Sequence, residues 1–128
     1  MNIEHIAIWV EDIELMKSFY ETYFKAQASE RYHNPDKNFT SYFLGFDTGT
    51  RLELMHSPHI KPYKKELKAH LGLAHFAVSV GSKQKVHQLT KQLKIGGYPI
   101  IGEPRTTGDG YYESVILDPE GNRIEITV

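Results

Sequence analysis

Two histidines occupy equivalent positions in a duplicated segment of the chain. Residues 2–10 (NIEHIAIWV) align with residues 72–80 (GLAHFAVSV), seventy positions further on, with histidine on histidine, alanine on alanine and valine on valine. Self-similarity at a fixed offset indicates repeated structural units, and two copies indicate a duplicated module instead of a solenoid. His5 and His75 are therefore equivalent residues of two modules.

Two glutamates repeat in the same way. The segment RLELM at residues 51–55 matches RIEIT at residues 123–127, seventy-two positions further on. Glu53 and Glu125 are the central residues of these segments. Each module thus carries one histidine near its start and one glutamate near its end.

Two imidazoles and two carboxylates form a set of nitrogen and oxygen donors that suits a divalent cation of intermediate hardness. We expect one such ion per site, with nickel, cobalt or zinc favoured and iron or manganese left open. Four protein ligands on an octahedral ion leave two positions for water or substrate oxygens. The ion would polarise a substrate carbonyl and stabilise an enediolate formed by deprotonation, while a glutamate that partly releases it moves the proton.

The alternation of side chains along a strand predicts which face each candidate takes. One face of the four segments is wholly apolar, and its burial against a helix would drive folding. A glutamate does not occupy that face unpaired, because burying an isolated charge is costly. We therefore expect the ligand candidates on the opposite, concave face, with a substrate pocket beside them. The predicted metal ligands are His5, Glu53, His75 and Glu125, and the predicted pocket residues are Trp9, Met55, Ser79 and Arg123.

Each half of the chain is expected to fold as one strand, one helix and three further strands. The first half has expected strands at 3–10, 27–33, 40–46 and 51–56, with a helix after the capping residue Asp12. The second half has expected strands at 72–80, 98–102, 111–118 and 122–128, with a helix from Ser82 to Gly96 and a loop at 103–110. Residues 57–71 would form a linker with one helical turn near 63–70. The sequence thus predicts one α+β domain over 1–128, built from modules 1–56 and 72–128.

Composition argues against several classes of function. A net charge of −1 gives no electrostatic reason to expect nucleic acid or a membrane surface as a partner. The chain has no cysteine, which removes disulfides, thiolate metal sites and cysteine nucleophiles. No apolar run reaches the roughly 18 residues of a membrane span, and no signal-peptide pattern precedes the first strand, so a cytoplasmic protein is expected. Exposed strand edges in such small modules favour a homodimer.

Simpler interpretations of the four candidates exist. A lone histidine in a strand is usually structural, and a lone glutamate on an edge strand is usually solvated. A duplication can also copy the residues of a site that has since decayed. The register of all four residues across the repeat favours the metal site. The other histidines, among them His56 and His59 near the end of the 51–56 strand, have no counterpart at the repeat offsets.

The chain resembles the vicinal oxygen chelate superfamily, and among its members the short bacterial glyoxalase I (lactoylglutathione lyase) group. The resemblance rests on the two histidine segments, on LEL at 52–54 and on LDPEGNRIE at 117–125. It implies two tandem βαβββ modules that form a curved, partly closed mixed sheet with the helices outside. It also implies that the matched His and Glu residues bind the metal, with Glu125 as base and Glu53 as ligand and second acid or base. The implied substrate is a small oxygen-chelating molecule such as a 2-oxoaldehyde–thiol hemithioacetal, often bound between two subunits.

Two departures from the family pattern bear on the substrate. Trp9 stands where the family has an arginine that holds glutathione, and Ser57 stands where it has an asparagine. Polar groups that would orient the carboxylates of glutathione are thus missing. Epimerisation of an acyl thioester, a dioxygenase-like reaction, thiol transfer to an epoxide antibiotic and non-catalytic binding of a drug or metabolite stay open. So do the metal, the substrate, and whether a site forms within one chain or across a dimer.

Overall fold

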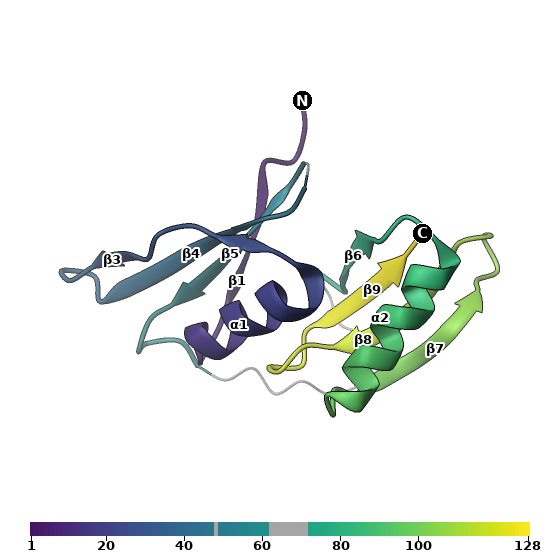
Figure 1. Ribbon diagram of the computed structural model, residues 1–128. Helices are drawn as coiled ribbons and strands as arrows, with labels where there is room; N and C mark the ends of the chain where they lie inside the picture. Colours follow the sequence, from purple (N-terminus) through teal and green to yellow (C-terminus); the bar gives the residue numbers. More distant parts are fainter. Residues whose placement is uncertain (48, 62–71) are drawn as a thin grey trace. The chain divides into compact units, whose positions relative to one another are not determined.

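The computed structural model of the chain describes residues 1–47, 49–61 and 72–128 (Figure 1). Two compact units form, Met1–Lys64 and Lys65–Val128. Most of the predicted 57–71 linker, including its helical turn near 63–70, lies outside the described residues. The assignment of 1–128 to one domain stays a prediction. No helix among the described residues is long and apolar enough to cross a membrane.

The first unit consists of one helix and a five-stranded sheet. Its elements are β1 (His5–Trp9), α1 (Ile13–Phe24), β2 (Gln27–Ala28), β3 (Tyr32–Asn34), β4 (Phe39–Gly45) and β5 (Arg51–His56). The strand order is β1-β5-β4-β2, and β1 runs parallel to β5. The predicted strand at 27–33 is divided into β2 and β3, which both pair with β4. The first and last strands of the unit therefore lie side by side.

The second unit repeats this plan with four strands. Its elements are β6 (Phe76–Ser79), α2 (Lys83–Ile95), β7 (Ile100–Thr106), β8 (Tyr112–Leu117) and β9 (Arg123–Thr127). The strand order is β6-β9-β8-β7, and β6 runs parallel to β9. Figure 1 shows α2 lying along one face of this sheet. The predicted α+β class is confirmed. As predicted, each module begins with a strand and a helix and continues with further strands.

The region between α2 and β8 differs from the prediction. Residues 103–106, expected in a loop, extend β7 as far as Thr106. Pro104 is tolerated there because β7 is the outer strand of the sheet, where a missing N–H leaves no ladder bond unmade. The pairing of β7 with β8 shifts register between Ile100 and Gly102 and again between Gly102 and Arg105. Irregularities of this kind bend an edge strand and re-aim its side chains.

Both predicted helix starts are confirmed. The Asp12 carboxylate accepts a hydrogen bond from the Leu15 N–H at 2.9 Å, and the Ser82 hydroxyl accepts one from the Lys85 N–H at 3.3 Å. The end of α2 is followed by Gly97 with a φ of 85°, a conformation that glycine adopts without strain. The end of α1 was not apparent from the sequence, because Lys25 takes the left-handed conformation there, with a φ of 55°.

The apolar strand faces form the cores, as the alternation predicts. In the first unit Val10, Leu44, Leu52 and Leu54 are buried, as are Met16, Phe19 and Tyr20 of α1. In the second unit Ile116, Ile124 and Ile126 are buried, as are Val86, Leu89 and Leu93 of α2. Each such side chain contributes about 1.5–3 kcal/mol on burial. The opposite strand faces carry the histidines and glutamates of interest.

The turn between β8 and β9 is fixed by one buried carboxylate. Asp118 Oδ1 accepts hydrogen bonds from the backbone N–H groups of Glu120 and Asn122, at 3.0 and 2.7 Å. Its other oxygen, Oδ2, accepts one from the Asn122 side-chain amide at 2.7 Å. This turn sets the register in which β9 returns along β8, with Val115 opposite Glu125.

Candidate metal centre

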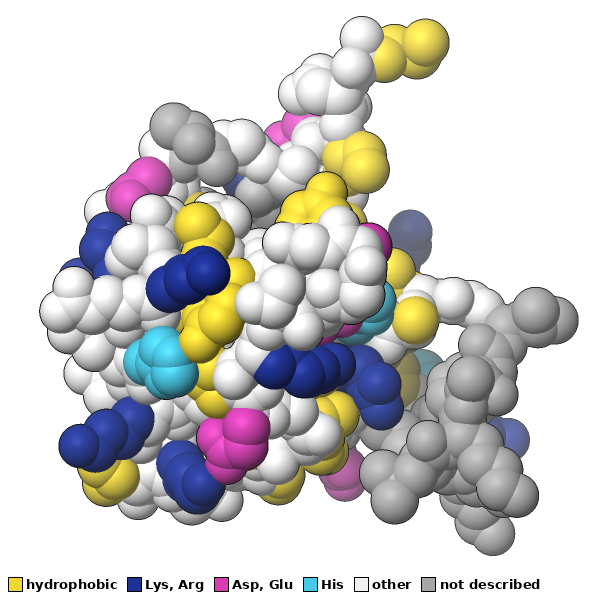
Figure 2. Space-filling view, turned by 90° about the vertical axis from the view of Figure 1, so that its right-hand side faces the viewer, with side chains coloured by type: hydrophobic (Ala, Val, Ile, Leu, Met, Phe, Trp, Pro, Cys, Tyr) yellow, Lys and Arg dark blue, Asp and Glu magenta, His cyan; other side chains and the backbone are white. Residues whose placement is uncertain are grey.

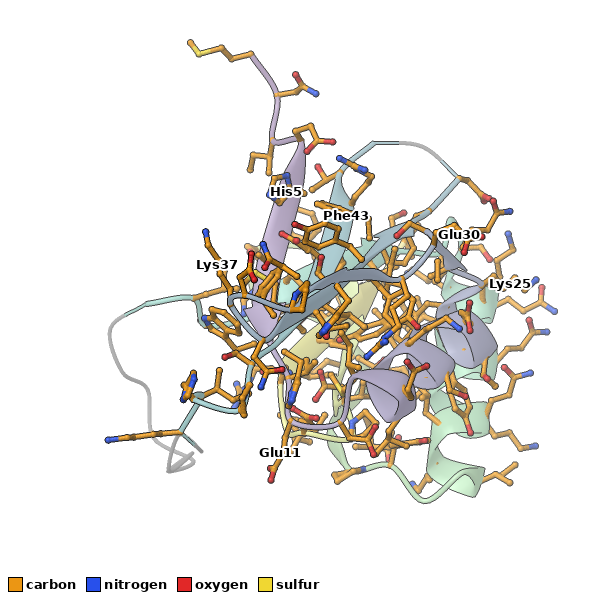
Figure 3. All side chains as sticks on the ribbon, turned by 90° about the vertical axis from the view of Figure 1, so that its left-hand side faces the viewer. His5, Glu11, Lys25, Glu30, Lys37 and Phe43 are labelled. Atoms are coloured by element: carbon orange, nitrogen blue, oxygen red, sulfur yellow. The ribbon has the colours of Figure 1, made fainter. Side chains whose placement is uncertain are left out.

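In the first unit, strand pairing places His5 beside Glu53. The parallel register places Ala7 of β1 opposite Glu53 of β5. Ala7 follows His5 by two residues, so their side chains lie on the same face of the sheet. The His5 Nε2 atom lies 3.9 Å from Glu53 Oε2. The His5 and Phe43 rings also form a T-shaped contact, with their centroids 5.4 Å apart (Figure 3). The sheet face opposite α1 therefore offers one nitrogen and one carboxylate donor.

The second unit contains an equivalent histidine–glutamate pair, and we call each of the two pairs a His–Glu couple. Here Ala77 of β6 lies opposite Glu125 of β9, and His75 immediately precedes β6. The His75 Nε2 atom lies 3.3 Å from Glu125 Oε2. In both units an alanine follows the histidine by two residues, and the glutamate of the couple lies opposite that alanine. The repeat found in the sequence is a repeat of strand register as well.

The two couples fit a divalent cation by donor chemistry and spacing. An imidazole nitrogen and a carboxylate oxygen bound at about 2.1 Å and at a right angle lie about 3.0 Å apart. The separation of 3.3 Å in the second unit is close to that value. The separation of 3.9 Å in the first unit lies between it and the roughly 4.2 Å of opposite ligands. Each couple gives two donors, and no three potential ligands gather among the described residues. The four-ligand centre of His5, Glu53, His75 and Glu125 therefore stays a prediction.

The predicted pocket residues all lie on the faces that carry the couples. Trp9 is 53% exposed, and its ring meets the Phe39 ring edge to face at 6.1 Å. Met55 pairs with Trp9 across β1 and β5, and Ser79 pairs with Thr127 across β6 and β9. Arg123, two residues before Glu125, is exposed. Their contact with a substrate stays a prediction.

A buried glutamate beside Glu125 was missed in the sequence. Glu113 of β8 is 8% exposed, and its carboxylate lies 3.7 Å from the Arg105 guanidinium. Burial, and then the charge of Glu125, raises the pKa of the Glu113 carboxyl. A Cβ at Gly102 would lie 2.7 Å from Arg105 Nη1, so glycine leaves the space that this guanidinium uses. The alternation in 112–117 places Glu113 on the face of Val115, and this signal would have revealed it.

We predict that Glu113→Gln stabilises the metal-free protein at pH 7, by on the order of 1 kcal/mol. Because the folded-state pKa of Glu113 is raised, the folded state holds a proton that the unfolded state releases above the ordinary glutamate pKa of 4.5. Stability is therefore lost as the pH rises through this window, and a neutral amide avoids that loss. Urea unfolding at pH 7 and at pH 4 checks it, with a smaller difference expected at pH 4. The control is Glu103→Gln, an exposed glutamate of β7.

Glu4 also approaches the first couple. Its carboxylate contacts both the His5 ring and the Arg51 guanidinium. Hydrogen bonds from His5, and then from Arg51, hold the pKa of the Glu4 carboxyl below its ordinary value. The sequence repeat did not reveal Glu4, because alanine stands at the equivalent position 74.

Three other histidines contact groups outside the couples. His56 Nδ1 lies 3.0 Å from the Val10 carbonyl oxygen, and His33 Nδ1 lies 2.9 Å from the Thr40 hydroxyl. The Nε2 atom of the exposed residue His87 lies 2.5 Å from the Tyr112 hydroxyl. His70 lies outside the described residues.

The surface carries mixed charge. Figure 2 shows basic, acidic and hydrophobic side chains interspersed over one face of the described chain. The net charge of the whole sequence is −1.

Comparison with known families decides the relationship of the chain. Residues 2–126 match the model of the Glyoxalase/Bleomycin resistance protein/Dioxygenase superfamily. The chain belongs to this superfamily. Solved structures of the superfamily share its fold: a glyoxylase/bleomycin resistance protein/dioxygenase domain from Frankia superposes with a TM-score of 0.85 at 14% identity, covering 100% of this chain and 97% of that one.

Two relatives of the superfamily bear on activity. Human mitochondrial methylmalonyl-CoA epimerase is 30% identical in an alignment 116 residues long that covers 78% of this chain and 64% of the epimerase. A glyoxalase I mutant from Zea mays superposes with a TM-score of 0.81 at 25% identity, covering 98% of this chain and 44% of that one. The chain thus spans about two thirds of the epimerase and less than half of the maize enzyme. Bacillus subtilis YwbC, an uncharacterized protein, is 30% identical over 97% of this chain and 94% of its own length.

Proposed function

We propose that the chain is a divalent-metal-dependent isomerase of the lactoylglutathione lyase type, which moves a proton on a carbon beside a carbonyl group. The observation that carries the proposal is the His–Glu couple repeated in register, with separations of 3.9 and 3.3 Å. The sheets are already held together by their apolar faces. Stability therefore gives no reason to keep the same two polar residues on both opposite faces.

His5, Glu53, His75 and Glu125 would hold the cation, with nickel, cobalt or zinc favoured for this donor set. A bound divalent cation supplies a Lewis acid that polarises the substrate carbonyl and stabilises the negative charge that develops on it.

Glu125 is the proposed base. It breaks the substrate C–H bond by taking the proton onto a carboxylate oxygen, and the proton then returns to carbon from Glu125 or from Glu53. On the side of the first strand of each module, the cross-strand neighbours of Glu125 and Glu53 are Ala77 and Ala7, whose methyl groups occupy little space. On the other side the neighbours are Val115 and Phe43. A substrate can therefore approach either carboxylate without a bulky side chain intervening from the first strand.

Two substrate classes share this chemistry. A hemithioacetal of a 2-oxoaldehyde and a thiol is the substrate implied by the glyoxalase resemblance. An acyl thioester is the alternative, supported by the 30% identity to an enzyme named methylmalonyl-CoA epimerase. The flat, exposed Trp9 side chain and the hydroxyl of Ser57 replace groups that would orient glutathione, which weakens the case for glutathione itself. We further propose that the active species is a homodimer acting on a small molecule.

The test combines metal analysis with an isotope assay. Elemental analysis of the purified chain should find about one divalent ion per site, and incubation in D2O should place deuterium on the reactive carbon of a substrate. Methylglyoxal with glutathione and racemic methylmalonyl-CoA are the two probes, and exchange with one of them identifies the substrate class. Oxygen consumption with bound iron would instead support a dioxygenase. Metal-free protein that binds small molecules without exchange would support a binding protein.

A further inference from the structure

The first couple has an additional residue, Glu4, that has no equivalent in the second. The Glu4 carboxylate contacts Nδ1 of His5, the ring nitrogen that does not face Glu53. His5 Nδ1 lies 2.5 Å from Glu4 Oε2, while Nε2 faces Glu53 at 3.9 Å. A neutral imidazole carries one proton, on one of its two nitrogens, and the other nitrogen keeps a lone pair. When Nδ1–H donates to the Glu4 carboxylate, the lone pair is on Nε2, the atom that faces the second donor.

Glu4 is itself held in place by β5. Its Oε1 atom contacts the Arg51 guanidinium, and its backbone carbonyl accepts a hydrogen bond from the Arg51 N–H at 3.0 Å. The guanidinium carbon lies 4.2 Å from the centre of the Phe43 ring, whose neighbour is the His5 ring. Glu4 and Phe43 thus both contact the His5 ring, whose side chain is 41% exposed.

The second couple has neither of these partners. Ala74 precedes His75 where Glu4 precedes His5, and Val115 lies opposite Glu125 where Phe43 lies opposite Glu53. Arg123 stands at the position equivalent to Arg51. Of the three residues that accompany the first couple, Glu4, Phe43 and Arg51, only the arginine therefore has an identical counterpart in the second module. The two couples are therefore equivalent in their donors and different in what supports them.

We propose that Glu4, held by Arg51, is a positioning residue that keeps the proton of His5 on Nδ1 and presents Nε2 as a metal ligand. This rests on the proposed function in that His5 is taken to bind the ion. Partners of this kind orient a ligand and raise its basicity, and their loss typically weakens metal binding by about 10- to 100-fold. This support is specific to the first module, because the histidine of the second has no carboxylate beside it in the sequence.

The first measurement needs neither metal nor substrate. Nitrogen-15 spectra of the metal-free protein at about pH 8.5, where imidazole is neutral, report which ring nitrogen of His5 carries the proton. The wild-type protein should show the Nδ1–H form, and Glu4→Ala should show a mixture of both forms. Glu4→Gln should keep the Nδ1–H form, because its amide oxygen still accepts the hydrogen bond. A His5 spectrum that is identical in the wild type and in Glu4→Ala would overturn the proposal.

The second measurement is the affinity for Zn²⁺, determined by competition with a chelator. Glu4→Ala should bind Zn²⁺ about 10- to 100-fold more weakly than the wild type, and Glu4→Gln should lose less. Glu30→Ala is the matched control, because Glu30 is an exposed glutamate of the same unit that lies apart from His5 in Figure 3. Zn²⁺ affinity of Glu4→Ala within twofold of wild type would contradict the role. A wild-type protein that binds no Zn²⁺ would contradict the proposed function and leave the tautomer result standing, so the two failures are distinguishable.

Discussion

Glu125→Gln should lower turnover by about 100- to 10,000-fold while the protein stays folded. The amide has the size and shape of the carboxylate but does not accept a proton under these conditions. Glu125 lies at the centre of β9, between Ala77 of β6 and Val115 of β8, and its side chain is only 20% exposed. The substitution keeps the packing of this strand and removes the group that would take the substrate proton. Deuterium exchange into the responsive substrate measures the loss.

The control for this variant is Glu103→Gln, which removes an exposed carboxylate that pairs with Lys94 at 2.6 Å. It should leave exchange unchanged, because exposed ion pairs contribute little to stability and this one lies on the edge strand. Metal content must be measured alongside, since Glu125 is also a predicted ligand. Full exchange in Glu125→Gln would remove Glu125 from the mechanism, and a loss confined to Glu53→Gln would assign the base to the first module.

Removing either histidine should weaken metal binding by more than about 100-fold, since even the loss of an outer-shell partner costs about 10- to 100-fold. His5→Ala and His75→Ala each delete one nitrogen donor from a couple. Because an ion that binds only the folded state stabilises it, the wild type should gain about 2.7 kcal/mol when the ion is present at 100 times its dissociation constant. The variants should gain much less at the same ion concentration. Thermal unfolding with and without Ni²⁺ or Zn²⁺ measures the difference.

The matched control here is His33→Ala, because His33 contacts the Thr40 hydroxyl and takes no part in either couple. Its gain from added metal should equal that of the wild type. If His5→Ala and His75→Ala were both stabilised by added metal as much as the wild type, the metal would bind elsewhere or would not bind specifically. A loss in only one of the two would mean that the couples do not share one ion.

Local patterns in the sequence were enough to predict the helices and the strand faces. Asp12 and Ser82 are helix caps whose side chains act within three residues, so no distant contact is needed to identify them. The faces of β5 and β9 follow from period-two alternation, which placed Glu53 and Glu125 opposite the buried leucines and isoleucines. The repeat offsets matched histidine to histidine and glutamate to glutamate, and within each unit the strand register places the glutamate near the histidine.

Features that depend on distant contacts escaped the sequence. The segment 103–110 was expected to be a loop, and β7 continues to Thr106 because an edge strand tolerates Pro104. The alternation in 112–117 indicates the face that Glu113 takes, but its burial depends on neighbouring strands that the local pattern does not describe. The role of Glu4 depends on Arg51, forty-seven residues away, and has no counterpart in the repeat that would draw attention to it. Lys25 takes a conformation that glycine usually occupies, which no composition rule would indicate.

The parallel pairing of the first and last strands in each unit has a consequence for how the chain is made. Each histidine is among the earliest residues of its module to leave the ribosome, and the glutamate beside it is among the latest. A nascent module has no couple until its final strand has docked. Once the final strand has paired, both residues of the couple belong to the same module. Two copies of the chain that exchange whole modules would therefore keep both couples intact.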